Sequence, residues 1–211
     1  QEFNLFADQA QMEIFEQYFY DLDQFERRPG SDNEYYDNAQ AVRDKIQIFH
    51  NAISYPVGDG SQLPSDTYRI IEVTIAVELN SGETITTVIE QIDRAEITKY
   101  SMSPLTMATS KRPVFFIAEN SIYFLPSQIS GQGKLVIVKK PLKPYWPYII
   151  HNQSALYNSA DPKIQDFQLH PSEENNLVIK ILQLAGITIK DFNLAQAAGQ
   201  KELITTQQKK Q

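Results

Sequence analysis

Two of the three histidines lie near carboxylates in a pattern that could bind a metal ion. His151 and His170 fall in stretches without periodicity, and Asp166 and Glu174 each lie four residues from His170. A four-residue spacing places two side chains on one face only when both are in a helix. Pro171 marks a helix start, so His170 should lie just outside that helix. We therefore expect no metal site here.

Other patterns that carry catalysis are missing from the sequence. No Gly-x-Ser-x-Gly motif is present, and the absence of cysteine excludes thiolate nucleophiles and disulfides. Gly131 and Gly133 precede Lys134, but a strand follows where a phosphate-binding loop needs a helix, so this pair predicts a turn. Paired carboxylates of a hydrolase could come from anywhere in the chain, and nothing points to such a pair. We expect a chain that is not an enzyme, with no catalytic, metal-binding or cofactor-binding residue and no cofactor.

The composition indicates a folded acidic protein. Of its 211 residues, 42% are hydrophobic and 21% are charged, which is ordinary for a globular chain. The formal net charge is −7, and no long basic run offsets it. Binding to duplex DNA depends on neutralising phosphates with Lys and Arg, so sequence-specific or tight DNA binding is not expected. The eleven Tyr and eleven Phe suit cores and interfaces, where each buries a large area.

The sequence carries no signal for membrane insertion. No apolar run reaches the roughly 18 residues that predict a bilayer span. The first residues have neither the basic start nor the apolar centre of a secretory signal, and we expect no membrane partner. Residue 1 is Gln rather than Met, which leaves open a native start upstream of it.

Two helices are predicted in the first quarter of the chain. Residues 5–26 carry an apolar stripe at 3-4-3 spacing, which predicts a helix; its members are Met12, Phe15, Phe19 and Leu22. Ser31 and Glu34 form a capping box before a second amphipathic helix that runs to Phe49. Residues 1–54 should therefore form a helical hairpin. The aromatic stripe must be covered either by the core or by a neighbouring subunit, and both readings stay open.

Residues 67–147 are predicted to form a β domain. Alternating apolar residues over 68–79 and a β-branched run over 84–92 predict two strands around a turn at 80–83. Residues 113–118, 121–125 and 134–139 predict three more, so we expect an antiparallel sheet or a small barrel. Proline at every third position then favours an extended arm over 141–147, which contains Pro144, Tyr145 and the only Trp, Trp146.

The last part of the chain is predicted to be irregular apart from one helix. Residues 148–192 combine an aperiodic stretch with a helix that starts at Pro171 and has Gly186 as its C-cap. Residues 193–211 form a polar tail in which Leu194 and Ile204 could dock on a partner. The fold class is α+β, with an N-terminal helical hairpin, an antiparallel β sheet or small barrel, a C-terminal helix and an extended tail.

An ordered set of short segments over residues 68–211 resembles neck ring proteins of crAss-like and related phages of Bacteroidetes hosts. The segments, which precede a Gly186-Ile187 step and a Gln/Lys-rich tail, are 101–106 (SMSPLT), 111–116 (KRPVFF), 122–126 (IYFLP), 138–146 (VKKPLKPYW), 166–173 (DFQLHPSE) and 177–182 (LVIKIL). The match is weaker over residues 1–67. The resemblance implies a structural virion protein, made in the host cytoplasm, that forms a homo-oligomeric, dodecameric ring at the head–tail junction. Its implied partners are the portal protein, other neck or tail proteins and the passing genomic DNA.

Subunit contacts in such a ring need apolar surface, and three parts of the sequence offer it. The candidate interface residues are Met12, Phe15, Phe19, Leu22, Pro144, Tyr145, Trp146, Leu194 and Ile204. A carbohydrate- or protein-binding β module of a phage tail or surface protein is a competing expectation, because exposed aromatics at 145 and 146 could stack on sugars. A hydrolase is a third, and it would require a cleft with convergent acids.

Overall fold

A computed structural model describes residues 2–27, 33–58, 60–78, 84–127, 129, 131–152, 154–188, 199–201 and 203–204. The chain divides into two units that are described separately. The helical unit comprises Gln1–Ile48 and Pro141–Gln211, and the β unit comprises Phe49–Lys140. The predicted α+β class is confirmed. The sequence-based division assigned residues 141–147 to the β domain, whereas the structure groups them with the helices.

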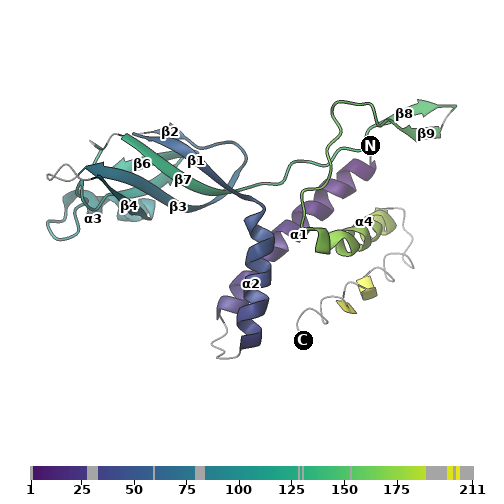
Figure 1. Cartoon of the computed structure of the whole chain (residues 1–211), viewed down its shortest axis with the longest axis horizontal. Helices are drawn as coiled ribbons and strands as arrows, with labels where there is room; N and C mark the ends of the chain where they lie inside the picture. The colour runs from purple at the N-terminus through teal and green to yellow at the C-terminus, as the bar shows by residue number, and fades with distance from the viewer. Residues whose placement is uncertain are drawn as a thin grey trace. The chain divides into compact units, whose positions relative to one another are not determined.

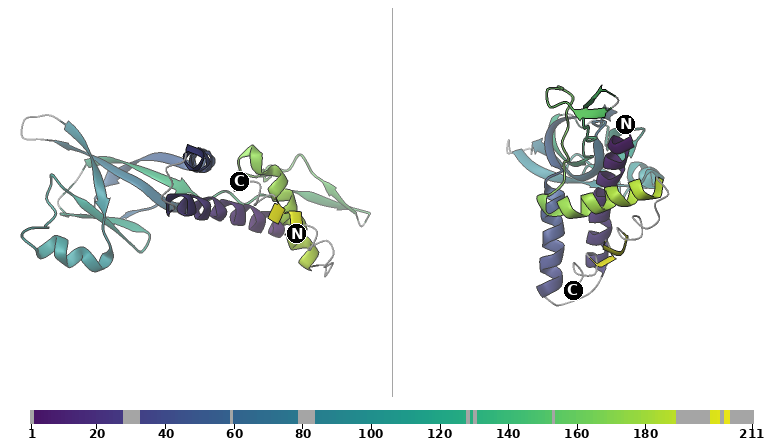
Figure 2. Two further views of the ribbon diagram at one scale, coloured as in Figure 1. Left: turned by 90° about the horizontal axis from the view of Figure 1, so that it is seen from below. Right: turned by 90° about the vertical axis from the view of Figure 1, so that its right-hand side faces the viewer.

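Three helices form the framework of the helical unit. They are α1 (Glu2–Arg27), α2 (Asn33–Gln47) and α4 (Glu174–Thr188), the last preceded by the 3-10 turn η2 (Pro171–Glu173). α1 packs against both α2 and α4, and Figure 2 shows α2 beside α1 and α4 running across it. The buried face of α1 repeats every three or four residues, as a packed helix requires, and consists of Ala7, Ala10, Gln11, Ile14, Phe15, Tyr18 and Phe19. None of the described helices has the length and apolarity needed to cross a bilayer.

The ends of two helices differ from the sequence predictions. The second helix ends at Gln47, and residues 50–54 belong to a strand rather than to the helical hairpin. Burial alternates along that strand, with Ile53, Tyr55 and Val57 turned inward. This two-residue period fits a strand better than the continuation of the helix that the sequence predicted. α4 continues to Thr188, so Gly186 is a buried position inside the helix and not its C-cap. The predicted capping box falls on Ser31, outside the described residues, and on Glu34, whose side chain is not described.

Within the described residues, the β unit is a seven-stranded sheet ordered β1-β7-β3-β4-β5-β6-β2. Figure 1 labels all of these strands except β5. The strands are β1 (His50–Val57), β2 (Ser61–Gln62), β3 (Thr67–Glu78), β4 (Thr84–Gln91), β5 (Val114–Ala118), β6 (Ser121–Leu125) and β7 (Gly131–Lys139). Neighbouring strands are antiparallel except β4 and β5, which run parallel over two residue pairs. A parallel pair needs a crossover, and here η1 (Arg94–Glu96) and α3 (Ile97–Met102) lie in it. The predicted turn at residues 80–83 lies outside the described residues.

The sheet is nearly closed, and its two edge strands, β1 and β2, follow each other in the chain. Tyr55 Oη donates to Ser61 O at 3.2 Å, and Ser61 Oγ donates to Pro56 O at 3.0 Å, so side chains join the two edges. The enclosed core is formed by Tyr55, Val57, Leu63, Val73, Ile75, Ile89, Phe115, Ile122, Phe124, Leu135 and Ile137. Closure hides the backbone groups that an open sheet would leave unpaired.

Gly133 shows why the predicted glycine turn is a strand. Gly131 and Gly133 both lie in β7, which pairs with β1 on one side and β3 on the other. A Cβ at residue 133 would lie 2.7 Å from Thr74 O, closer than any side chain tolerates. The glycine therefore allows the backbones of β7 and β3 to approach closely inside the sheet, rather than turning the chain.

The stretch predicted to be irregular contains a β hairpin. β8 (Tyr148–His151) and β9 (Ser154–Tyr157) pair antiparallel around Asn152, whose φ of 50° suits a tight turn. All four residues of β9 are exposed, and so are three of the four in β8. Within the described residues neither face of this hairpin is buried, so its sequence lacks the alternation that identifies half-buried strands.

Candidate interaction surfaces

The aromatic stripe of α1, one of the predicted interface elements, is largely core. Phe15 is fully buried at 0% exposure, Phe19 is buried, and their rings meet edge to face with centroids 5.2 Å apart. Met12 and Leu22 are half-buried. The stripe is therefore covered by the helical unit itself, which is the core reading of the pattern, and it leaves little for a neighbouring subunit.

Exposed apolar side chains lie elsewhere on α1, at positions that the periodicity did not single out. Phe3, Leu5 and Tyr20 are all exposed. Leu5 and Tyr20 lie fifteen residues apart, about four helical turns, so they point the same way. The sequence could have indicated this exposure, because these residues lie outside the apolar stripe. A large apolar residue on the polar face of a helix cannot reach the core.

The proline-rich arm is fixed to α1 by a buried glutamine. Gln11, fully buried, donates from Nε2 to Leu142 O at 2.8 Å and accepts from Gln168 N at 2.9 Å. Gln168 Oε1 in turn accepts from Leu142 N at 2.8 Å. These three bonds tie α1 to two chain segments that lie far from it in sequence. The sequence could have indicated these bonds, because Gln11 lies beside the apolar stripe. A buried amide needs hydrogen-bond partners.

A second amide holds the arm near the start of α1. Asn4 Oδ1 accepts from Trp146 N at 3.0 Å, and Asn4 Nδ2 donates to Trp146 O at 3.3 Å. Phe3 lies edge-on to the Trp146 ring with centroids 5.6 Å apart, and Trp146 stacks on Tyr157 at 5.5 Å with planes 9° apart. Pro144 is buried, whereas Tyr145 and Trp146 remain partly exposed. The two aromatic residues predicted as interface candidates are therefore accessible, and the proline is not.

The β8–β9 hairpin extends this aromatic cluster with apolar side chains. Ile150 is 75% exposed, and Ile149, Leu156 and Tyr157 are exposed as well. Trp146 joins the hairpin to α1 through its contacts with Tyr157 and Phe3. We call Phe3, Trp146 and the four hairpin residues the hairpin surface. Ile149 pairs with Leu156 on one face of the ribbon, and Ile150 lies with Tyr157 on the other. Large exposed apolar groups of this kind are typical of places where another molecule binds.

The predicted tail residues contribute less. Leu194 lies outside the described residues, and Ile204 is exposed. Val178 and Leu182, one turn apart on α4, are exposed too, whereas Leu177 is buried.

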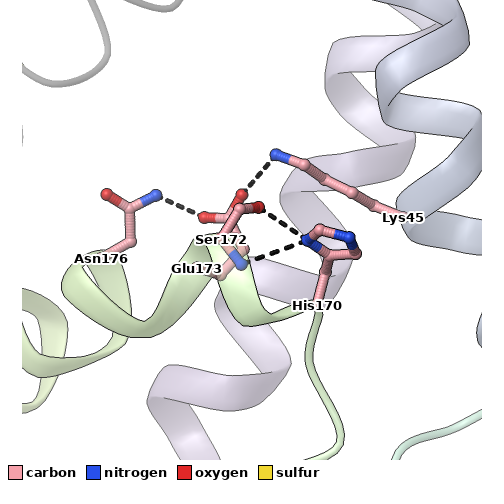
Figure 3. Close-up of polar contacts among 5 residues, drawn as sticks. All are labelled: Lys45, His170, Ser172, Glu173 and Asn176. Carbon is pink, nitrogen blue, oxygen red and sulfur yellow. Dashed lines mark hydrogen bonds and ion pairs between the residues drawn. The ribbon is translucent and has the colours of Figure 1, made fainter.

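A buried ion pair joins α2 to the start of α4 (Figure 3). Lys45 Nζ lies 2.6 Å from Oε1 of Glu173, which is 2% exposed, and Asn176 Nδ2 donates to the second carboxylate oxygen. Lys45 also lies over the ring of Tyr18, 5.9 Å from its centroid. Burial, with a smaller contribution from the Glu173 charge, raises the pKa of the Tyr18 phenol above its usual range. The cluster has a structural role. Lys45 and Asn176, together with the helix start, compensate the buried negative charge of Glu173, so the ion pair holds α2 against the start of α4.

His170 and His50 take part in local structure. His170 Nδ1 accepts from Ser172 N at 3.1 Å and lies 2.8 Å from Ser172 Oγ, so the ring caps η2. His50 begins β1, and burial lowers its pKa. Across the part of the chain that the structure describes, no three His, Cys, Asp or Glu side chains gather as a metal site would require.

The crossover between β4 and β5 carries both exposed apolar and exposed basic side chains. Leu105 is 96% exposed, and Met102 and Met107 are exposed beside it. Arg94, Lys111 and Arg112 are exposed in the same crossover. Comparison with other proteins adds no assignment: no protein-family model matches this sequence, and no curated protein has a significantly similar one.

Proposed function

We propose that this chain is a non-catalytic structural protein of a virion, forming a homo-oligomeric ring in the neck of a tailed bacteriophage. In this role it joins the portal to the tail and lets the genome pass. The observation that carries the proposal is the hairpin surface, where a two-stranded sheet exposes Ile149, Ile150, Leu156 and Tyr157. The resemblance of residues 68–211 to neck ring proteins supplies the place in the virion.

The hairpin surface favours assembly because its apolar side chains are exposed to solvent and its two strands have little support. A two-stranded hairpin alone is marginally stable in water, and β8 and β9 gain support from the stacking of Tyr157 on Trp146. Burying an exposed isoleucine contributes about 1.5–3 kcal/mol, so covering several such side chains in a subunit contact is strongly favourable. A ring provides that cover on every copy, because each copy offers one surface and receives a different one.

The charge of the chain suits a DNA passage. With a net charge of −7, the assembled ring repels phosphates on average, which allows DNA to slide without being held. α1 contributes strongly, with seven acidic residues and one basic residue. No sequence-specific readout is proposed.

A carbohydrate- or protein-binding β module of a phage tail or surface protein is the second candidate. The observation that favours it is the exposure of the stacked pair Trp146 and Tyr157, because exposed aromatic rings also bind sugar faces. This candidate requires no ring and predicts that a Trp146→Ala change abolishes glycan binding.

The test is the oligomeric state of the full chain. Sedimentation velocity and negative-stain electron microscopy should show a closed ring, and Ile150→Asp should shift the chain toward monomer. Val88→Asp is the matched control, because Val88 is a comparably exposed apolar residue on β4. A monomer at every concentration, with glycan binding that depends on Trp146, would replace the ring with the second candidate.

A further inference from the structure

The crossover of the β unit is an ordered surface rather than a loose loop. Ile92, Ala108 and Val114 anchor it in a small apolar cluster of its own. Its backbone is tied internally, with Ala108 N donating to Tyr100 O at 2.9 Å and Met107 N donating to Ser103 O at 2.8 Å. An exposed segment held this firmly loses little conformational freedom when it binds a partner.

The outer side of this crossover combines positive charge with apolar groups. Residues 94–112 contain four basic residues and one acidic residue, in a chain whose net charge is negative. Lys99 pairs with Glu96 at 3.2 Å, and both are exposed to solvent. The remaining cations, Arg94, Lys111 and Arg112, form no ion pair within the described part of the chain. We call these three cations with Met102, Leu105 and Met107 the basic ridge.

α1 has the complementary character along its outer face. A stripe that repeats every three to four residues, exposed except for the half-buried Glu13, consists of Glu2, Leu5, Gln9, Glu13, Glu16, Tyr20 and Asp23. Glu13 is held by Lys180 at 3.3 Å, whereas Glu2, Glu16 and Asp23 form no ion pair within the described residues. Leu5 and Tyr20 supply apolar area between the acids. We call this set the acidic stripe.

From these two surfaces we infer that the basic ridge of one copy docks on the acidic stripe of the next copy. This inference rests on the proposed ring and names its contact. A head-to-tail ring needs two different, mutually complementary patches on one chain, and the ridge and the stripe meet that requirement in both charge and apolar content. Both are exposed in the folded chain, so each is available to a second molecule.

The hairpin surface adjoins the acidic stripe within the helical unit. Phe3, beside the first acid of the stripe, contacts Trp146, which stacks on Tyr157 of the hairpin. One copy therefore offers acidic side chains on α1 and exposed aromatic side chains next to the start of that helix. The apolar residues of the basic ridge, of which Leu105 is the most exposed, supply groups that can be buried against this part of α1 and the hairpin.

Charge reversal tests the pairing of the two surfaces. Lys111→Glu with Arg112→Glu should raise the concentration at which half the chains assemble by about tenfold or more, because acids would then face acids. Glu16→Lys with Asp23→Lys should do the same. The four changes combined in one chain should restore the ring, and so should an equal mixture of the two double variants.

Matched controls keep the total charge equal. Lys134→Glu with Lys140→Glu reverses two exposed lysines of the β unit outside the ridge, and Glu90→Lys with Glu119→Lys reverses two exposed acids outside the stripe. Both control chains should assemble as the parent does. Circular dichroism on every variant shows whether it is folded.

A crosslink gives an independent readout, because the parent chain has no cysteine. Leu105→Cys mixed with a differently tagged Tyr20→Cys chain should give a disulfide-linked pair of the two tags under mild oxidation. Leu105→Cys mixed with Val88→Cys should not.

The outcomes separate this inference from the proposed function. If the parent forms rings while the reversal variants behave like their controls, the ring stands and the ridge–stripe contact is wrong. If the reversals leave the ring intact but abolish its binding to a purified portal or tail protein, the ridge belongs to a different partner and the inference is also wrong. A parent chain that never assembles overturns both.

Discussion

The β unit buries its apolar side chains, whereas the hairpin of the helical unit exposes them to solvent. In the β unit, Ile122 is 0% exposed inside a nearly closed sheet, and Leu135 and Ile137 pack beside it. In the hairpin, Ile150 and its apolar neighbours face solvent on both sides of a two-stranded ribbon. Both regions are β structure built from similar residues. The difference shows that strand content alone does not make a core, because a sheet must also close or be covered.

The strongest challenge to this comparison is a matched pair of isoleucine changes. Ile122→Ala should lower the free energy of unfolding by about 4 kcal/mol, because it removes buried methyl groups and leaves a cavity. Ile150→Ala should change it by less than about 0.5 kcal/mol in the dilute monomer, since its side chain is already in water. Urea unfolding of both variants measures the contrast. Equal losses would mean that the hairpin is part of a core.

The β unit is stabilised by the apolar core inside its sheet. Removing the carboxylate of Glu173 tests whether the helical unit depends instead on a buried ion pair. Glu173→Ala should cost about 3 kcal/mol, because Lys45 and Asn176 would lose their shared acceptor in a buried site. Glu174→Ala, the exposed neighbour, should cost much less. Urea unfolding followed by circular dichroism at 222 nm reports this helix-rich unit. A small effect at Glu173 would show that water replaces the lost oxygen.

Gly133 tests how tightly the sheet is packed. Gly133→Ala should cost about 2 kcal/mol, because the added carbon would meet Thr74 O and force strands β7 and β3 apart. Gly58→Ala, where no atom lies within 4 Å of an added carbon, is the control. Thermal melting read out by strand signals should separate the two variants, and identical melting temperatures would refute the close approach.

Tyr18 gives the smallest expected effect and a pH signature. Its buried hydroxyl has no hydrogen-bond partner within the described residues, so Tyr18→Phe should be neutral or stabilise by about 1 kcal/mol. The folded protein favours the neutral phenol, so the parent should lose stability as the pH rises above about 10, the usual tyrosine pKa, toward the higher folded value. The variant should show a shallower loss between pH 9 and 11 in urea titrations. Burial raises the pKa of Tyr55 as well, so some slope should remain.

Much of the fold could be predicted because local patterns encode it. The 3-4 spacing of Phe15 and Phe19 identified α1, and alternation identified β3. β1 was missed because its first residues were assigned to the helical hairpin, and β8 and β9 were missed because an uncovered hairpin has no alternation. Periodicity shows which residues share a face but not what covers that face. The aromatic stripe was therefore open to both the core and the interface interpretation, and the structure buries its two phenylalanines.

The site features that sequence reasoning missed are long-range contacts. Gln11 meets Gln168, and Lys45 meets Glu173, across more than 120 residues in each case. No local spacing reports such a pair. The aromatic residues at 145 and 146 could be anticipated, because bulky rings in a proline-rich arm have few neighbours in sequence to bury them.

The ends of the β unit lie next to each other, since Lys139 N donates to Phe49 O at 2.9 Å. The unit is thus a single uninterrupted piece of chain whose entry and exit coincide, set into a helical unit that is split in two by it. Such an arrangement is that of an inserted module. The β unit can be exchanged, enlarged or cut out and joined by a short linker without changing the distance that the two halves of its host must span, which would let one scaffold carry different strand domains.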